Sequence, residues 1–262
     1  SSTITGGITT TLDSYHNGVR IGLGAGSTSQ DTAVGVSALA ANTTGVYNTG
    51  VGWSALSANT IGTDNTGIGN GALMANTTGY SNTAVGSGSL LANTTGSGNT
   101  AVGTSSLRAN TVGIQLTAVG SGALNSHTTG TNNTAVGFNA AYYMTTGQEN
   151  TAIGKDSMQK TTTGINNIAV GSYALYTNVT GQSNVAVGRS ALNLSTVDAS
   201  TAIGHYALQA NTTGTGNTAV GYSGLYNNTT GVNNTAVGNT ALQSNTTGVN
   251  NTAVGASALI LN

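Results

Sequence analysis

Small apolar and β-branched residues recur along this chain at a fixed spacing. The block Asn-Thr-Ala-Val-Gly ends in glycine at positions 35, 52, 69, 86, 103, 120, 137, 154, 171, 188, 204, 221, 238 and 255. Each step is 17 residues except one of 16, between Gly188 and Gly204. A short fixed period predicts a solenoid in which each rung contacts only its neighbours. Seventeen residues are too few for a helix pair, and β-branched runs punctuated by glycine favour two short strands per rung.

The columns of this repeat predict a core. The residue before each motif glycine is always Val or Ile, and a Thr, or once Ile168 and once Val185, stands two places earlier. Side chains alternate along a strand, so these two columns share one face. Leu fills the equivalent column of the expected second strand in twelve rungs, with Ala141 and Met158 as exceptions. We expect the Val/Ile and Leu columns to fill the inside of the coil.

A column of small residues lies between the two β-branched columns. Ala is a poor strand former, and a strand that is apolar on both faces is buried on both faces. We therefore predict that this column packs against sister subunits in a homotrimer. The predicted trimer-interface residues are Ala33, Ala84, Ala101, Ala118, Ala135, Ala152, Ala169, Ala186, Ala202, Ala219, Ala236 and Ala253.

Asn and Gly mark the corners of each rung. Asn opens eleven of the fourteen rungs and begins nine of the thirteen Asn-Thr-Thr-Gly corners. Both residues tolerate the left-handed backbone that tight corners require, and stacked Asn side chains can form hydrogen-bonded ladders. The fold class is thus all-β: a parallel β-solenoid of about fourteen 17-residue rungs.

The first thirty residues lie outside the register. We expect residues 1–30 to form an N-terminal cap and a short first rung, with Val19 and Ile21 as β-branched partners and Gly22 as its corner. Residues 31–262 form the repeat domain. Ile260 and Leu261 are apolar and have no rung after them, which predicts that further chain or another subunit covers them.

Composition narrows the possible functions. Of 262 residues only 4% are charged, 40 are glycine, none is proline or cysteine, and the net charge is −1. There is no basic stripe for nucleic acid, no polybasic membrane patch and no apolar stretch of membrane-spanning length, so we expect neither nucleic-acid binding nor membrane insertion. The lack of cysteine excludes disulfides and thiolate metal ligands.

Large and charged residues concentrate in rungs seven to twelve, at the two residues after each motif glycine and the two after each Leu column. The same stretch departs from the repeat at Met144 and Thr161 and contains the one-residue deletion near Asp198. Exposed aromatic rings with nearby amides and a few charges suit stacking on sugar rings or docking on proteins, and solvent-facing decoration is the alternative. This predicted receptor-binding set, called the strip below, is Phe138, Tyr142, Tyr143, Lys155, Lys160, Tyr173, Tyr176, Arg189, His205, Tyr206, Tyr222 and Tyr226.

Other sequence motifs give little indication of ligand binding or catalysis. The sequence Gly-Leu-Gly-Ala-Gly at 22–26 lacks the helix of a phosphate-binding loop. His16, His127 and His205 share no column, which favours structural or surface roles over metal binding. Six acidic residues cannot line a calcium site in every rung. We expect no catalytic residues, no metal, no cofactor and no enzyme activity.

The repeat resembles known fibre proteins. The template Asn-Thr-Ala-Val-Gly-x-x-Ala-Leu-x-x-Asn-Thr-Thr-Gly is similar to repeats of bacteriophage tail fibres, which often end in an endosialidase-type chaperone domain. It also resembles the Asn-Ser-Val-Ala-Ile-Gly block of trimeric autotransporter adhesin heads. That resemblance implies a trimer of left-handed parallel β-rolls, although a 17-residue repeat is longer than the adhesin-head repeat.

These features predict a structural fibre segment and adhesin. We expect a homotrimeric tail-fibre shaft or receptor-binding region, on a virion or otherwise extracellular, that attaches to a glycan or protein receptor on a host cell. One alternative is an adhesin head on a bacterial cell surface. Another is an ice-binding solenoid, because Thr43, Thr77, Thr94 and Thr212 share one column.

Overall fold

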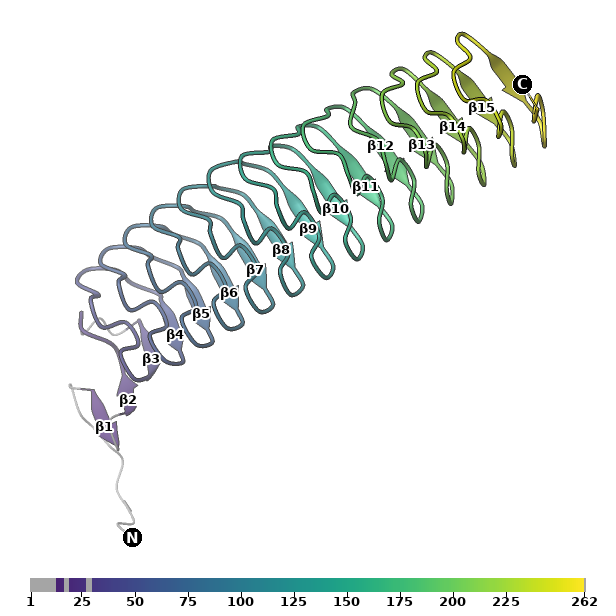
Figure 1. The fold of residues 1–262 in the computed structure, drawn as a ribbon. Coiled ribbons are helices and arrows are strands. Elements are labelled where there is room, and N and C mark those ends of the chain that lie inside the picture. The colour runs from purple at the N-terminus through teal and green to yellow at the C-terminus, as the bar shows by residue number, and fades with distance from the viewer. Residues whose placement is uncertain (1–12, 17–18, 27–29, 262) are drawn as a thin grey trace.

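The chain forms a long coil with one continuous sheet along its side (Figure 1). The computed structural model describes residues 13–16, 19–26 and 30–261, and these residues contain strands and turns but no helix. Sixteen strands pair in chain order. They are β1 (Ser14–His16), β2 (Val19–Gly22), β3 (Thr32–Gly35), β4 (Thr49–Val51), β5 (Thr66–Ile68), β6 (Thr83–Val85), β7 (Thr100–Val102), β8 (Thr117–Val119), β9 (Thr134–Val136), β10 (Thr151–Ile153), β11 (Ile168–Val170), β12 (Val185–Val187), β13 (Thr201–Ile203), β14 (Thr218–Val220), β15 (Thr235–Val237) and β16 (Thr252–Val254).

Strands β3 to β16 are parallel and keep strict register. In the β9–β10 pair Thr134 lies beside Thr151 and Ala135 beside Ala152, and the other pairs repeat this match. One turn of the coil therefore advances the sequence by one repeat. The predicted parallel β-solenoid with a 17-residue repeat is confirmed, with about thirteen turns between β3 and β16.

Each rung has one strand, so the prediction of two strands per rung is wrong. The half of the rung that carries Leu alternates between right- and left-handed backbone, with φ of +59° at Ser37 and +48° at Leu39. Its amides still bond to both neighbouring rungs: Leu39 N–H donates to the Ala55 carbonyl at 3.0 Å, and Ser54 N–H donates to the Val36 carbonyl at 2.8 Å. Stacking therefore holds a backbone conformation that a lone Leu would avoid.

The core lies between the sheet and this turn-forming half of each rung. Leu39, Leu90 and Leu124 are fully buried, as predicted. The strands, however, turn their Ala column inward, and Ala101 and Ala118 are also fully buried. The Val/Ile column faces outward and is half-buried or exposed along the whole sheet. The prediction that Val and Ile fill the inside is therefore wrong.

The inward Ala column also follows from the width of the coil. The Leu side chains reach close to the strands: a Cβ added to Gly67 of β5 would lie 3.4 Å from the Leu56 Cδ1 atom and 3.1 Å from the Ala72 carbonyl oxygen. Only a methyl group or a hydrogen fits opposite Leu in so thin a core. Close approach of backbone does explain the small residues, as the sequence suggested, but the backbone is the chain's own.

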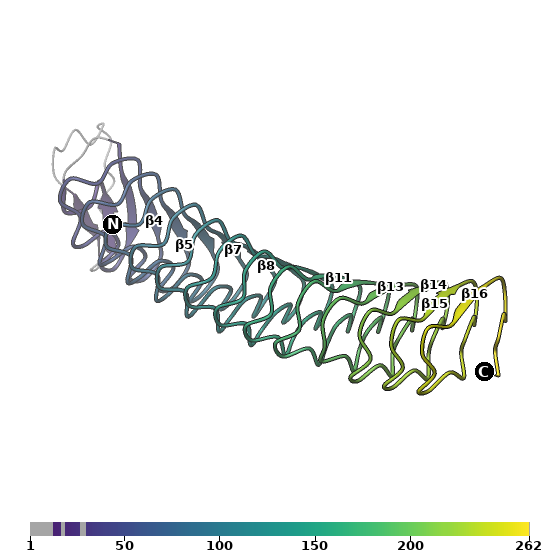
Figure 2. The same ribbon diagram turned by 90° about the horizontal axis from the view of Figure 1, so that it is seen from above.

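Strands β1 and β16 lie at opposite ends of the rod, which curves gently when seen from above (Figures 1 and 2). At the N-terminal end β2 pairs with β3 antiparallel, with Ile21 beside Val34, and β1 pairs antiparallel with β2. The predicted first rung is therefore wrong in direction, because a rung would run parallel to β3. The described part of 1–30 turns back and covers the end of the coil.

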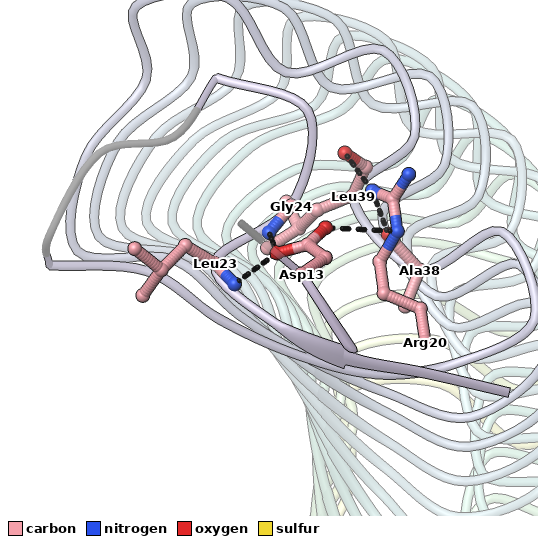
Figure 3. Close-up of polar contacts among 6 residues, drawn as sticks. All are labelled: Asp13, Arg20, Leu23, Gly24, Ala38 and Leu39. Carbon is pink, nitrogen blue, oxygen red and sulfur yellow. Dashed lines mark hydrogen bonds and ion pairs between the residues drawn. The ribbon is translucent and has the colours of Figure 1, made fainter. Parts of the chain in front are cut away.

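An ion pair fixes this N-terminal cap (Figure 3). The Asp13 carboxylate lies 3.1 Å from Arg20 Nε and accepts hydrogen bonds from Leu23 N–H at 2.7 Å and Gly24 N–H at 3.3 Å. Arg20 also donates to the Ala38 carbonyl at 3.2 Å. Because both charged side chains are largely shielded from solvent, the pair ties the cap to the first Leu turn.

Candidate binding surfaces

The outward side of strands β3 to β16, called the sheet face below, is a surface of Thr, Val and Ile. The Thr column is half-buried in most rungs, and the Val/Ile column reaches 37% exposure at Val102 and Val119 and 39% at Ile153. No charged residue occurs in any of these fourteen strands. Contiguous apolar surface of this kind marks an interaction site more often than it faces water alone.

The predicted trimer-interface residues do not lie on this surface. The side chains of the alanine column are 0–3% exposed in the single chain, so they have no surface to offer to another subunit. That prediction is wrong because the strand is turned by one residue relative to expectation, which exchanges its inner and outer faces. The residues set aside were Ala33, Ala84, Ala101, Ala118, Ala135, Ala152, Ala169, Ala186, Ala202, Ala219, Ala236 and Ala253.

The strip lies on the other side of the core, along the turns that carry the Leu column. Its cations Lys155, Lys160 and Arg189 are exposed, and its aromatic side chains are exposed or half-buried. Each variable position of one rung stacks on the same position of the next. The strip residues therefore form neighbouring columns on one surface.

The first half of the strip joins two lysines to two tyrosines. Lys155 Nζ lies 5.7 Å from the centre of the Tyr173 ring, and Lys160 Nζ lies 5.2 Å from the centre of the Tyr176 ring. The two rings meet edge to face, 5.7 Å between centroids. Each lysine is one rung before its tyrosine, so the contacts depend on the stacking of rungs and could not be read from one repeat.

The second half of the strip is built around Tyr206. The Arg189 guanidinium lies 5.9 Å from the ring centre and donates a hydrogen bond to the Tyr206 hydroxyl at 3.2 Å. His205 stacks on the ring at 3.9 Å between centroids, and the edges of Tyr222 and Tyr226 approach within 6.3 and 6.1 Å. The structure thus brings together five of the predicted receptor-binding residues in one cluster.

The remaining strip residues lie toward the N-terminal side of the two lysines. Tyr142 and Tyr143 meet edge to face at 4.8 Å, and Phe138 and Tyr143 are both about half exposed. Asp156 lies among them with 6% exposure; it accepts a hydrogen bond from Gln159 Nε2 at 2.8 Å and lies 3.8 Å from Lys155 Nζ. One shielded acid therefore lies beside the three exposed cations of the strip.

Inside the corners, two columns of buried Asn form the predicted ladders. Asn76 Nδ2 donates to Asn59 Oδ1 at 2.8 Å in one column, and Asn82 Nδ2 donates to Asn65 Oδ1 at 3.1 Å in the other. Each side chain also bonds to a corner carbonyl, as Asn82 does to Gly96 O at 2.8 Å. None of the Asn residues in these two columns has a left-handed backbone. Asn is therefore favoured here by its side-chain hydrogen bonds, and not by its tolerance of a left-handed conformation.

His127 replaces Asn in the first of these ladders and is fully buried. Its Nδ1 lies 3.3 Å from Asn110 Oδ1, and its Nε2 lies 3.2 Å from Asn133 Nδ2. An amide oxygen faces Nδ1 and an amide nitrogen faces Nε2, which assigns a neutral ring with its proton on Nδ1. Burial lowers the pKa of His127 from 6.5 to about 4, and the Gly147 backbone opposes part of that shift.

The Thr column that we considered for ice binding uses its hydroxyls for hydrogen bonds within the chain. Thr77 Oγ1 donates to the Thr94 carbonyl at 3.1 Å, and Thr43 and Thr212 make the same bond to the next rung. These hydroxyls therefore help to hold successive corners together. The outward Thr column of the sheet face, which we expected to be buried, is likewise half-buried in most rungs.

The surface of the described residues has shallow hollows. Two hollows of about 180 Å³ lie beside the corners, one lined by Gln148, Glu149, Ile165 and Asn166. Sites for small molecules usually span about 300–1,000 Å³. Among the residues that the structure describes, no three His, Cys, Asp or Glu side chains gather closely enough to hold a metal ion. The same residues include no helix of membrane-spanning length and apolarity.

Comparisons with models of protein families, with curated proteins and with solved structures found no match to this chain.

Proposed function

We propose that the chain is a structural fibre segment and adhesin, in which copies associate through the sheet face and attach to a cell surface through the strip. The observation that carries this proposal is the sheet face itself, which is continuous over fourteen strands and free of charge. A rod with one apolar side and one side rich in Tyr, Lys and Arg has separate surfaces for assembly and for adhesion.

The partner at the sheet face is a second and a third copy of the same chain. Every copy presents the same Thr and Val/Ile columns at the same rung spacing, so sheets can match along their whole length. Three sheets around a common axis bury their apolar columns together, which is the arrangement implied by the resemblance to trimeric adhesin heads. In this arrangement Val102 and Ile153 take the role first given to the alanines.

Self-association predicts a sharp difference between two pairs of Val-to-Lys substitutions. Val102→Lys with Val119→Lys places charges on the sheet face, where a desolvated ammonium opposes contact. Val112→Lys with Val179→Lys makes the same change at similarly exposed sites off the sheet. Sedimentation equilibrium should show trimers for the wild type and the second pair, and monomers for the first. A monomeric wild type would refute the assembly.

Adhesion by the strip is tested with matched tyrosine substitutions. Replacing Tyr173, Tyr176 and Tyr206 with Ala removes the rings that organise the strip, whereas Tyr47→Ala with Tyr80→Ala removes two exposed rings elsewhere. With circular dichroism unchanged, adsorption of labelled protein to host cells should fall only for the triple variant. Equal adsorption would move the receptor site off the strip.

The location that fits this role is extracellular, on a virion tail fibre or on a bacterial surface. Both settings use the same architecture, and the resemblance of the repeat supports each. The two settings are distinguished by whether the intact fibre is purified with virions or with the outer surface of a bacterium. Antibodies against the described rungs in immunoelectron microscopy provide that measurement.

Ice binding is a second candidate, favoured by one observation. Thr and Val/Ile columns repeat outward on a regular, charge-free sheet, and such a surface can order water. The two functions make opposite demands on this face, because assembly buries it and ice binding exposes it. A monomer with measurable thermal hysteresis would favour ice binding, and a trimer without hysteresis would favour the fibre.

A further inference from the structure

The few charges of this chain are distributed unevenly. There are five Lys and Arg residues, and three of them, Lys155, Lys160 and Arg189, lie in the strip. The shielded Asp156 is the acid beside them, so the local charge is three minus one, or +2, in a chain of net charge −1. A concentration of one sign of charge on one surface favours ligands of the opposite sign.

The cations are held in place by rings. Lys155 and Lys160 lie over Tyr173 and Tyr176, and Arg189 lies over Tyr206 and bonds to its hydroxyl. Cation–ring contacts restrict the stems of these side chains, and all three side chains remain exposed to solvent. An arginine fork restrained in this way is suited to a planar carboxylate, which it binds with two parallel hydrogen bonds.

Accessible rings flank these cations on both sides. Phe138 and Tyr143 lie before the lysines and Tyr222 lies after Arg189, each about half exposed. Tyr206, in contrast, is enclosed by His205 and its other neighbours and acts as a support. Exposed rings bind the apolar faces of sugar rings, so the order along the rod is ring, cations, ring.

We propose that the strip binds an acidic polysaccharide, with carboxylates on the three cations and sugar rings on Phe138, Tyr143 and Tyr222. This inference rests on the proposed adhesive role of the strip and adds the chemical class of the receptor. Lys155 and Arg189 occupy the same column two rungs apart, which is about 9–10 Å. That spacing is comparable to the distance between carboxylates in a polysaccharide with one acid per disaccharide.

Charge density separates this ligand from a nucleic acid. Duplex DNA carries one charge per about 1.7 Å of its axis, and its binding draws on many closely spaced cations. The strip has three cations, which are spread over residues 155–189. A sparse polyanion with sugar faces matches both the spacing of the charges and the presence of accessible rings.

The experiment measures binding of the whole chain to immobilised polysaccharides. The probes are hyaluronan, polygalacturonate and polysialic acid, with neutral dextran and single-stranded DNA as comparisons. Arg189→Gln with Lys160→Gln should weaken binding to at least one acidic probe by more than about tenfold, because each of the two substitutions removes one charge-assisted contact. Arg108→Gln, an exposed arginine outside the strip, should leave it unchanged. Tyr222→Ala should also weaken binding.

Each other outcome overturns the proposal. These are failure to bind any acidic probe, equal binding to dextran or DNA, and equal loss in the Arg108→Gln control. Host-cell adsorption that still depends on the strip tyrosines would then preserve the adhesive function and reject only the acidic polysaccharide. Loss of both would reject the adhesive function as well.

Discussion

His127 shows how a single residue can make a repeating structure sensitive to pH. Its neighbours in the ladder offer an oxygen at Nδ1 and an amide nitrogen at Nε2. A second proton on Nε2 would point at the Asn133 amide, which is itself a donor, in a site without solvent. The neutral ring is therefore the form that fits, in agreement with its lowered pKa.

The stability of the chain should fall between about pH 6.5 and pH 4. In the unfolded chain His127 takes up its proton near pH 6.5, whereas the folded chain resists until about pH 4. Unfolding thus gains protons in this window, and the free energy of unfolding drops as pH falls, by up to about 3 kcal/mol; above pH 6.5 there is no effect.

His127→Asn supplies the control, because it restores the residue found at this corner in most rungs. Urea unfolding of wild type and variant, compared at about pH 7 and about pH 4.5, should show the extra loss only in the wild type. Parallel behaviour of the two proteins at both pH values would contradict the assigned role of His127.

At the scale of the rung, glycine serves two different purposes. Gly103 directly follows β7 and has φ of +129°, and an added Cβ would lie 2.6 Å from the Gly120 carbonyl carbon of the next rung. Gly98 has φ of +69°, yet its Cβ would meet nothing closer than 3.9 Å. Other rungs carry Asn132 and Asn166 at the Gly98 position, with the same left-handed backbone.

Two substitutions at these glycines should therefore differ greatly. Gly103→Ala forces neighbouring rungs apart and should cost about 3 kcal/mol or more, with loss of cooperative melting around β7 and β8. Gly98→Asn should be close to neutral, because Asn tolerates this conformation. Thermal melts followed by circular dichroism measure both. Equal melting temperatures would show that the rungs can separate without penalty at Gly103.

Much of the rung could be predicted from the sequence, and its inner face could not. The period, the parallel register, the Leu core and the Asn ladders follow from residues that repeat in columns. The alternation Thr-Ala-Val specifies two faces but leaves open which one is inside. Packing decides it, because the Leu side chains leave room only for Ala101 and its equivalents.

The strip was predicted as a set, and its internal contacts were not. Clustering of Tyr, Lys and Arg at variable positions is visible in the sequence. The pairing of Lys160 with Tyr176 joins residues in successive rungs, and its geometry depends on backbone that no strand propensity describes. The left-handed φ at Leu39 and its equivalents is likewise a property of stacked rungs, because no single repeat would adopt it.

At the scale of the whole rod, stability is a sum over rungs and the contacts between them. One corner is weaker than its neighbours. In the 16-residue rung both ladder positions carry serine, Ser195 and Ser200, and both hydroxyls are buried without a hydrogen-bond partner. Asn184 therefore ends its ladder before this corner, and Asn217 begins it again. In the other column, which already carries Met144 and Thr161 in place of Asn, Asn178 bonds only within its own corner, to Gly181.

The rod should open first at this corner, and Ser200→Asn should strengthen it. The Ser200 N–H donates to Asn184 Oδ1 at 3.0 Å, as the equivalent backbone amide does in other rungs. An Asn side chain at position 200 would therefore be placed to donate to the Gly214 carbonyl, as Asn82 donates to Gly96. Each hydrogen bond restored adds about 1 kcal/mol to the free energy of unfolding.

Hydrogen exchange should be faster at amides of Asn184–Asn217 than at the equivalent amides of Asn65–Asn99, and Ser200→Asn should slow the exchange at Asn184–Asn217. Ser172→Asn, at a half-buried position outside the ladders whose column carries Asn70 in another rung, should have no effect. Uniform exchange along the rod would mean that the ladders contribute little to holding the rungs together, and the thirteen turns would then depend on Leu packing and backbone bonds alone.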